Sequence, residues 1–327
     1  MKRLVTADIH LNSNPRDEYR HTFMEKTLPE LVHRHKPNEL VILGDLTDEK
    51  DYHGARLVNR IVAHIHRLAL IVPVCVLKGN HDYTDPDHPF FGFLSSVENV
   101  SWINKPLGTN GTFFLPHTHN YQRDWKGLNL QSAKLVFAHQ TFEGAKGVGP
   151  HTEGIPRSVF GPGTTVISGD VHIPQNIGGA IIYAGAPYTI DFGDDYSPRV
   201  LLAHDHDRVD SIPVPGRQKR LIEINQIYDL DPEMANDGDI VKVRMDIETN
   251  DHALWPELQA KIRSFGAQHG WWMYDVRPRV IVVGGKATAR RRTEVRTDEE
   301  LVRIYGKARG IGEKTLKTGL ELMRKGK

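Results

Sequence analysis

Cysteine is nearly absent from this chain of 327 residues, and long apolar runs are missing. The single cysteine, Cys75, cannot form an internal disulfide, which suits a reducing compartment, and its apolar neighbours predict a small core residue. No segment approaches the roughly 20 consecutive apolar residues of a membrane-spanning helix, and the N-terminal residues lack the apolar stretch of a signal peptide. We therefore expect a globular protein of the cytoplasm that binds no membrane.

Net charge is also small. The total is +1, from 42 Lys and Arg against 41 Asp and Glu, so total charge by itself points to no partner. Residues 290–327, however, carry 12 Lys and Arg against 6 Asp and Glu, a net charge of +6, which leaves −5 on the residues before them. A mildly acidic body therefore precedes a basic tail. Histidine, in contrast, is abundant, with 18 residues, and it is a common metal ligand.

Five short runs rich in Val, Ile and Leu each end in a polar cluster. Continuous apolar runs of this length are typical of strands that are buried on both faces. Segments with helical spacing of apolar residues separate the first three runs, so the opening predicts a βαβαβ unit with a parallel sheet. After residue 100 the strands follow one another more closely, which favours a more antiparallel second half. The runs lie at residues 3–10, 39–48, 72–82, 134–140 and 164–172.

Composition divides the chain into three parts. Residues 211–218 contain two prolines and a glycine and are typical of a linker. Beyond them, the patterns predict a strand at 238–247, a helix at 253–270 and a second strand at 277–283. We therefore predict a first domain at 1–210, a small α+β capping domain at 211–288 and a basic helical tail at 289–327.

The polar clusters consist of aspartate, histidine and one asparagine. In open α/β sheets, sites are assembled at the carboxyl ends of the strands, so these side chains are expected to converge. An isolated Asp at a strand end is more often a helix cap, but capping does not explain five clusters in succession. The converging residues would be Asp8, His10, Asp45, Asn80, His81, His139, Asp170 and His172.

Carboxylates, imidazoles and a neutral amide together suit a pair of divalent cations. Such ions, roughly 3.5 to 4 Å apart, need a bridging oxygen ligand, for which Asp45 is the natural choice, and open positions for water and substrate. Mixed nitrogen and oxygen ligands favour Mn²⁺, Fe²⁺ or Zn²⁺ over Ca²⁺. Because two such ions promote in-line displacement at phosphorus, the residues predict hydrolysis of a phosphate ester.

The motifs DIH, GDLTD, GNHD, AHQ and GDVH, in this order over roughly the first 200 residues, resemble those of the calcineurin-like metallophosphoesterases. The segment YAGAPYTIDFGDD at 183–195, the small module and the basic tail are similar to the SbcD/Mre11-type DNA repair nucleases, and the compact length suggests a phage or bacterial member. This resemblance implies an α/β fold, a four-layer αββα sandwich with a small α+β capping domain and a helical C-terminal tail. It places the protein in the cytoplasm of a bacterial cell or a phage-infected host.

The resemblance also implies a role for each site residue. His81 would stay off the metal ions and stabilise the transition state or protonate the leaving oxygen. Asp82 is expected to be structural, and Gly79 to permit a tight turn. The metal ligands would form two groups that share one carboxylate, namely Asp8, His10, Asp45 and His172 for one ion and Asp45, Asn80, His139 and Asp170 for the other.

Two positions depart from the family pattern. Relatives usually carry a histidine where Asp170 stands, and the carboxylate favours Mn²⁺ or Mg²⁺ over Zn²⁺. The nuclease branch often carries a histidine that helps to position substrate where Asp48 stands, so an acidic side chain that faced DNA there would weaken the nuclease interpretation.

The predicted function is that of a Mn²⁺-dependent DNA nuclease in repair, recombination or replication, a 3′ to 5′ exonuclease and single-strand endonuclease with two metal ions. Mg²⁺, Fe²⁺ and Zn²⁺ are the alternatives to Mn²⁺. A small-molecule or protein phosphoesterase on the same fold is a second hypothesis, which hydrolysis of a chromogenic diester but not of DNA would support. A non-catalytic adaptor is a third, and the near-complete ligand set argues against it.

Three partners are expected: DNA, an SbcC/Rad50-type ATPase and a second copy of the chain in a homodimer. DNA would be held by its backbone phosphates, with Arg16, Arg20, Lys146, Arg157, Arg217 and Lys219 as candidate contacts. HGWWMY at 269–274 is either a stacking platform for bases or part of a core.

The ATPase would bind the tail, because similar nucleases dock a helical element there. A capping box at 297–300 predicts a helix start, and apolar residues follow at helical spacing. The segment GIGEKT at 310–315 has a rival interpretation as a hairpin that holds a DNA phosphate. The two predicted apolar faces consist of Leu301, Ile304, Tyr305 and Ala308, and of Leu316, Leu320 and Met323.

Overall fold

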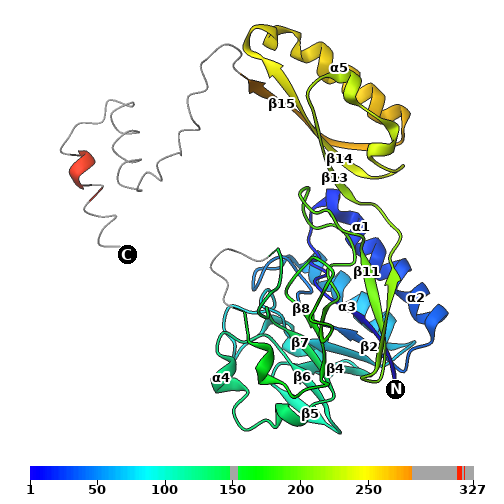
Figure 1. Ribbon diagram of the computed structural model, residues 1–327, viewed down its shortest axis with the longest axis vertical. Helices are drawn as coiled ribbons and strands as arrows, with labels where there is room; N and C mark the ends of the chain where they lie inside the picture. Colours follow the sequence, from blue (N-terminus) through cyan, green and yellow to red (C-terminus); the bar gives the residue numbers. More distant parts are fainter. Residues whose placement is uncertain (148–153, 282–314, 319, 321–327) are drawn as a thin grey trace. The chain divides into compact units, whose positions relative to one another are not determined.

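The computed structural model describes residues 1–147, 154–281, 315–318 and 320. The chain forms two compact units, one of Met1–Asp246 with Leu254–Arg279 and one of Ile247–Ala253 with Val280–Lys327. The first unit contains every predicted site residue, and Figure 1 shows the ribbon of the chain coloured along the sequence. The predicted capping box and almost all of the predicted tail helices lie outside the described residues.

The first sheet has six strands in the order β12-β11-β1-β2-β3-β4. Strands β1 to β4 are parallel, and β11 and β12 add an antiparallel edge next to β1. The predicted parallel βαβαβ opening is therefore confirmed. The strands are β1 (Lys2–Thr6), β2 (Glu39–Ile42), β3 (Val74–Leu77), β4 (Val100–Ile103), β11 (Arg199–His204) and β12 (Arg208–Pro213).

Helices cover one face of this sheet. In the longest, α3, the buried residues Leu57, Ile61, Ile65 and Leu68 recur every three or four positions, which turns one helical face onto the strands. The other helices of this layer lie within residues 18–35, between the first two apolar runs, and a π-helical turn at Phe23–Thr27 separates them. The helices are α1 (Glu18–Thr22), α2 (Leu28–His35) and α3 (Ala55–Ala69).

The second sheet also has six strands, in the order β5-β6-β7-β8-β10-β9. Its central pairs, β6 with β7, β7 with β8 and β8 with β10, are parallel, and only the two edge pairs are antiparallel. The expectation of a more antiparallel second half is therefore wrong for the centre of this sheet. The strands are β5 (Leu107–Thr109), β6 (Thr112–Leu115), β7 (Leu135–His139), β8 (Thr165–Gly169), β9 (Gln175–Ile177) and β10 (Ile181–Tyr183).

The two sheets pack face to face around an apolar core that includes Val5, Val41, Leu77, Phe137 and Ile167. The predicted core residue Cys75 lies in this layer, 2% exposed. Short helical turns cover the outer face of the second sheet. The predicted four-layer α/β fold is confirmed, with a thin fourth layer. These turns are α4 (Tyr121–Asp124) and the 3₁₀ turns Leu130–Ser132 and Arg157–Val159.

A third sheet, β13-β14-β15, follows in the chain. Its core includes Ile222, Val243, Ile262 and Trp271. The predicted strand–helix–strand module is present, but it also contains β13, which the sequence analysis did not predict, and β15 begins earlier than expected. The elements are β13 (Lys219–Ile224), β14 (Ile240–Glu248), α5 (Trp255–Gln268) and β15 (Trp272–Ile281).

Trp271 settles one of the two interpretations of the 269–274 segment. It is 4% exposed, and its indole Nε1–H donates to the Ala235 carbonyl at 3.0 Å, so it anchors the core of the module. Trp271 is therefore not part of a stacking platform. Trp272, the next residue, is 40% exposed.

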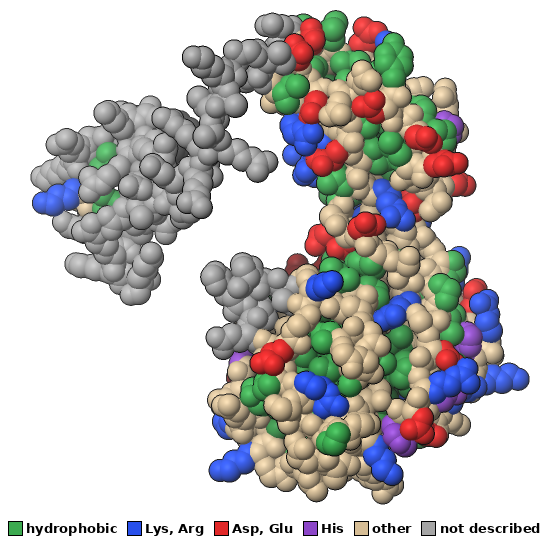
Figure 2. Space-filling view, viewed as in Figure 1, with side chains coloured by type: hydrophobic (Ala, Val, Ile, Leu, Met, Phe, Trp, Pro, Cys, Tyr) green, Lys and Arg blue, Asp and Glu red, His purple; other side chains and the backbone are tan. Residues whose placement is uncertain are grey.

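The remaining short 3₁₀ helices are distributed over loops. None of the helices among the described residues is long and apolar enough to cross a bilayer. Figure 2 shows charged side chains of both signs dispersed over the visible face. Charge alone therefore does not mark a nucleic-acid surface on that face. These short 3₁₀ helices are Pro15–Asp17, Phe90–Ser96, Ile227–Asp229, Pro232–Met234 and Thr249–Leu254.

Candidate metal centre

The predicted site residues lie at the carboxyl ends of five strands, β1, β2 and β3 of the first sheet and β7 and β8 of the second. His139 is the last residue of β7, and the others follow their strands within a few residues. Four of them adopt the left-handed backbone region, Asp8 (φ 53°), His10 (φ 48°), Asp45 (φ 53°) and Asp170 (φ 80°). Non-glycine residues rarely adopt this conformation, and it concentrates at functional sites.

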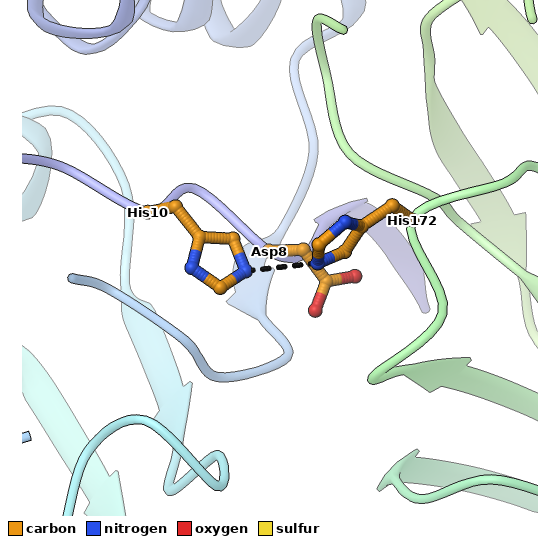
Figure 3. A group of neighbouring side chains, drawn as sticks. All are labelled: Asp8, His10 and His172. Carbon is orange, nitrogen blue, oxygen red and sulfur yellow. Dashed lines mark hydrogen bonds between the residues drawn. The ribbon is translucent and has the colours of Figure 1, made fainter. Parts of the chain in front are cut away.

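The first predicted ligand group is assembled around His10. Donor atoms of Asp8, His10 and His172 all lie within 4.8 Å of one another (Figure 3). His10 Nε2 lies 3.1 Å from His172 Nε2 and 3.5 Å from Asp45 Oδ2. Asp45 thus places one of its oxygens beside this group.

The second group surrounds His139. Its Nε2 lies 3.4 Å from Asp45 Oδ1 and 3.8 Å from Asp170 Oδ1. The Asn80 amide has one terminal atom 2.8 Å from His139 Nε2 and 3.1–3.2 Å from carboxylate oxygens of Asp45 and Asp170. The Asp45 carboxylate therefore contacts both groups, as a bridging ligand requires. All seven predicted ligands come together.

This arrangement fits cations. Asp8 Oδ2 is buried and has no hydrogen-bond partner among the described residues, and a buried carboxylate oxygen without a partner is costly. The Nε2 atoms of His10 and His172 face each other, and the Asn80 amide faces two carboxylates and an imidazole. If the Asn80 amide turned its nitrogen to these acceptors, it would donate hydrogen bonds to them. With its oxygen in this position, it joins them as a metal ligand. Two divalent ions would satisfy these convergent lone pairs.

The electrostatics of the cluster are those of an anionic pocket. Burial raises the pKa of the Asp8 carboxyl. Burial has the same tendency at Asp45, but the neighbouring His139 and His10 outweigh it and hold the Asp45 pKa below its usual range. Conversely, Asp45 and Asp8 raise the pKa of His139 in spite of burial, which disfavours the charged imidazole. Positive charge is therefore favoured in this pocket.

The second nitrogen of each buried histidine ligand is already engaged. His10 Nδ1 lies 3.2 Å from Asp48 Oδ1, and His139 Nδ1–H donates to the Leu43 carbonyl. These bonds leave Nε2 of both rings free to bind metal, the usual arrangement around metal-bound histidine.

Asp48 is held by neighbouring side chains, although its own side chain is 35% exposed. Arg20 donates to both of its oxygens at 3.0 and 3.1 Å, and Asn12 Nδ2 donates at 2.6 Å. Burial opposes ionisation, but the bonds from His10 and Arg20 lower the Asp48 pKa to about 2. This carboxylate therefore orients His10, a role that does not depend on substrate. Sequence reasoning missed this role, since no local pattern joins residues 10, 20 and 48.

His81 lies beside the first group. Its backbone N–H donates to Asp45 Oδ1 at 2.8 Å, and its Nδ1–H donates to the Asp48 carbonyl at 2.6 Å. A ring nitrogen lies within 4.8 Å of donor atoms of His10 and Asp45. Because Nδ1 is engaged, Nε2 is the nitrogen that remains available.

The turn after β3 has no room for a side chain at residue 79. A Cβ on Gly79 would collide with the backbone nitrogen and the side chain of Asp45. The expected tight turn is present, since the Asp82 N–H donates to the Gly79 carbonyl at 3.4 Å, and the close approach to Asp45 is a further reason for glycine at this position. Asp82 is confirmed as structural, because it accepts hydrogen bonds from the backbone N–H groups of Asp45, Leu46 and Gly79 at 2.7–3.1 Å.

Several candidate DNA contacts are engaged in the protein itself. Arg20 is buried against Asp48, Lys219 Nζ lies 3.0 Å from Asp17 Oδ1, and the guanidinium of Arg157 donates to three backbone carbonyls. These three side chains are structural, which corrects the sequence-based expectation. Sequence reasoning also missed an open cleft of about 940 Å³ that reaches Asp170 and is lined by His117, His119 and Tyr121.

Two viral proteins are similar in sequence. Protein 244L of Invertebrate iridescent virus 6, which carries the name of a phosphoesterase, is 26% identical over 226 residues, 62% of this chain and 75% of that protein. Protein 078R of Invertebrate iridescent virus 3, named in the same way, is 28% identical over 191 residues, 52% of this chain and 53% of that protein. The chain thus spans about half the length of the second relative.

Among solved structures, an archaeal phosphodiesterase shares 10% identity at a TM-score of 0.37, with 65% of this chain and 99% of that chain covered. Nuclease MPE of Pseudomonas putida shares 14% identity at a TM-score of 0.35, with 64% and 87% covered. Likeness at this level does not bear on the substrate.

The family model described as calcineurin-like phosphoesterase matches residues 1–208, which contain both ligand groups and His81. This match spans well over half of the chain. The chain belongs to the calcineurin-like phosphoesterases, a family of metal-dependent hydrolases of phosphate esters.

Proposed function

We propose that this protein is a Mn²⁺-dependent DNA nuclease that hydrolyses phosphodiester bonds as a 3′ to 5′ exonuclease and single-strand endonuclease. The observation that carries the proposal is the position of Asp45, whose carboxylate lies between the two ligand groups, 3.5 Å from His10 Nε2 and 3.4 Å from His139 Nε2. Such a pair of sites suits in-line displacement at a phosphodiester. The open cleft beside Asp170 supports a substrate larger than a single phosphate.

Two divalent ions, when bound, supply Lewis acidity and stabilise the charge that develops on the phosphoryl oxygens. His81 contributes from the protein side. Its ring is held by the Asp48 carbonyl, and this bond commits Nδ1 as the donor. Nε2 is then oriented to exchange a proton with an ester oxygen or to stabilise its charge. Asp48 and Arg20 hold the neighbouring His10 ring in place.

Mn²⁺ is proposed because of the donor types. The predicted set combines three imidazoles with three carboxylates and an amide, and mixed nitrogen and oxygen donors suit Mn²⁺. The carboxylate of Asp170 adds negative charge to the second group, which favours Mn²⁺ or Mg²⁺ over Zn²⁺.

The partner is proposed to be an SbcC/Rad50-type ATPase, in DNA repair, recombination or replication. The support is the sequence of residues 297–323, with its capping box and its apolar residues at helical spacing. This segment lies almost entirely outside the described residues.

The decisive experiment is incubation of the purified protein with end-labelled duplex and single-stranded DNA in Mn²⁺, Mg²⁺ or chelator, with and without the ATPase. A chromogenic phosphodiester is assayed in parallel. Cleavage of DNA in Mn²⁺, its loss in chelator and its loss in Asp45→Asn are the expected results. Asp207→Asn, an exposed carboxylate in the β11–β12 hairpin, serves as the matched control and should cleave as the wild type does.

Other outcomes separate the alternatives. Turnover of the chromogenic diester without any cleavage of DNA would identify a small-molecule phosphoesterase. Absence of both activities from metal-loaded protein would support an adaptor.

A further inference from the structure

Two clefts adjoin each other next to the metal centre. The larger, about 940 Å³, reaches Asp170 and is lined by Gln140 and Thr141, which directly follow the predicted ligand His139. The smaller, about 420 Å³, is lined by Lys78, which precedes Gly79 and Asn80. His117 and Thr118 line both clefts and form the ridge between them. The two clefts therefore share a wall, and the larger of them borders the metal centre at Asp170.

The ridge is held rigidly to the strands that carry metal ligands. His117 donates its backbone N–H to the Lys78 carbonyl at 2.8 Å, and its Nδ1 lies 2.9 Å from the Tyr83 hydroxyl. The Thr118 carbonyl accepts from Gln140 Nε2 at 3.3 Å. One side of the ridge is thus fixed to the end of β3 and the other to the end of β7. Such preorganisation is what a substrate-binding surface needs.

The larger cleft has the chemistry of a base-binding site. Its lining residues include two imidazoles and a phenol, His117, His119 and Tyr121, and the side-chain amides of Asn120, Gln122 and Gln140. It contains no Lys or Arg among the described residues, and it contains the carboxylates of Glu143 and Asp170. A phosphate is therefore disfavoured there, whereas a neutral nucleobase can stack on the rings and bond to the amides. Its volume lies at the upper end of the roughly 300–1,000 Å³ of ordinary ligand sites.

His119 is the exposed ring of this cleft. Its ring meets that of His117 edge to face at 4.9 Å, and the His117 ring is in turn fixed by Tyr83. Tyr121 is half-buried against Trp125, at 5.5 Å between ring centroids. Two supported rings therefore offer faces to a ligand, and neither has to become ordered on binding.

The smaller cleft has the chemistry of a phosphate site. It is lined by Lys78, Lys105 and Arg123, together with Asp87 and Asp124. Arg123 is paired with Asp124 at 2.6 Å, and the Lys78 ammonium lies 4.3 Å above the Tyr83 ring. Lys105 is exposed and forms no ion pair with any described residue. It is the cation most free to bind a phosphate.

We propose that these clefts form the track of a single polynucleotide strand. A nucleotide next to the scissile phosphate places its base on His119 and Tyr121 in the larger cleft. The strand then crosses the His117–Thr118 ridge, and a following phosphate lies against Lys105 and Arg123. This inference rests on the proposed nuclease function, and it names the substrate class as unpaired strands of several nucleotides rather than a mononucleotide or a small diester.

The test compares substrates of increasing length. The values of kcat and KM are measured in Mn²⁺ for a dinucleotide, a tetranucleotide and an octanucleotide of thymidine and for a chromogenic diester. The wild type should show a KM that falls with length. In His119→Ala and Lys105→Ala, the kcat/KM for the octanucleotide relative to that for the diester should fall by about tenfold, because a stacked base or a phosphate contact is lost. The change should lie in KM rather than in kcat.

Matched variants guard against a general structural effect. His119→Phe keeps an aromatic face and should restore the octanucleotide preference, which a loss of folding would not allow. His66→Ala and Lys134→Ala replace exposed residues of the same types outside both clefts and should behave as the wild type does. An unchanged octanucleotide preference in His119→Ala and Lys105→Ala would overturn the track.

Failure of the proposed nuclease function is a separate result. If the diester is hydrolysed and no DNA is cleaved, the nuclease proposal fails, and fluorescence anisotropy with the labelled octanucleotide then decides the track. Binding that is weaker in His119→Ala and Lys105→Ala than in the two controls would support it. Equal binding by all four variants, or absence of binding by the wild type, would reject it.

Discussion

His81 shows how a single residue can sit beside the metal ligands and remain available for chemistry. Its Nδ1–H is bound to the Asp48 carbonyl, and its backbone N–H is bound to Asp45. Both bonds orient the ring without using Nε2. A side chain held in this way matches a group that acts in the transition state.

We therefore expect His81→Ala to retain nearly all of its metal while cleavage falls by roughly 10²-fold or more, because a proton donor or electrostatic stabiliser is lost. Metal content by elemental analysis and single-turnover cleavage provide the two measurements. His88→Ala, an exposed histidine in the following loop, is the matched control. Loss of metal from His81→Ala would instead make His81 a ligand.

Asp48 acts through another residue. It accepts from Arg20 and Asn12 and lies 3.2 Å from His10 Nδ1. In Asp48→Asn, the new amide could still accept from Arg20 through its oxygen, but the charge that favours the His10 Nδ1–H is lost. We expect metal affinity to fall by roughly 10- to 100-fold, the usual effect of such a change.

Competition with a chromogenic chelator measures this affinity. Glu49→Gln removes an exposed carboxylate from the next position and is the control. If Asp48→Asn bound metal normally but its KM for DNA changed, Asp48 would belong to the substrate surface, as the sequence pattern had suggested.

The site residues were predictable because their chemistry is local. Each motif contains its own donor atoms and follows its own apolar run. Because the carboxyl ends of parallel strands meet at one edge of a sheet, the five motifs were expected to converge. Arg20 and the Tyr83–His117 pair were not predictable. Their partners lie 28 and 34 residues away, and only the folded chain brings them together.

At the scale of elements, the strand directions of the first sheet could be predicted from local sequence patterns, whereas those of the second sheet could not. The first three strands are linked by helices whose apolar spacing reveals crossover connections, so the parallel arrangement could be read from the sequence. Strands β6 and β7, and β7 and β8, are also parallel, and the described residues of their connections form irregular segments and one-turn helices. Without a helical period, these segments look like hairpin loops, which explains the incorrect antiparallel expectation.

Helices α1 and α3 contain a buried titratable contact. His21 Nδ1 lies 3.1 Å from His64 Nε2, and the two side chains are 1% and 2% exposed. Burial lowers the pKa of His64 from 6.5 to about 4, and it lowers the pKa of His21 as well. Between these pH values the unfolded chain binds a proton at His64 that the folded protein does not bind.

Unfolding free energy should therefore fall as the pH drops from 6.5 towards 4, by roughly 3 kcal/mol for His64. Above the unfolded-state pKa this contribution is fully present. In His64→Gln the fall should be smaller by that amount, whereas His66→Gln, on the exposed face of the same helix, should match the wild type. Urea unfolding in the presence of chelator measures the difference without a contribution from metal. If the unfolding free energy fell with pH by the same amount in His64→Gln and His66→Gln, the assignment of this pH dependence to His64 would be wrong.

At the scale of the whole molecule, the catalytic apparatus and the basic tail are separate in the chain. Every predicted ligand lies between residues 8 and 172, and the family match ends at residue 208. Residues 295–327 contribute none of these groups and carry 9 Lys and Arg against 5 Asp and Glu. Leu320 of this segment is already buried, 4% exposed, and the other apolar positions, Leu301, Ile304, Leu316 and Met323, would be costly to expose on isolated helices. A partner that covers them accounts for their spacing better than a phosphate-binding hairpin alone.

Deletion of residues 295–327 should accordingly abolish binding to the SbcC/Rad50-type ATPase and preserve Mn²⁺-dependent cleavage of short single strands. The first effect follows from loss of the apolar faces, and the second from the location of the ligands upstream. Co-purification with the ATPase and cleavage of a short oligonucleotide are the two measurements. If the truncated protein still co-purifies, or loses only affinity for DNA, then the basic and glycine-containing segment at 310–315 acts as a phosphate-binding hairpin, and the docking proposal is wrong.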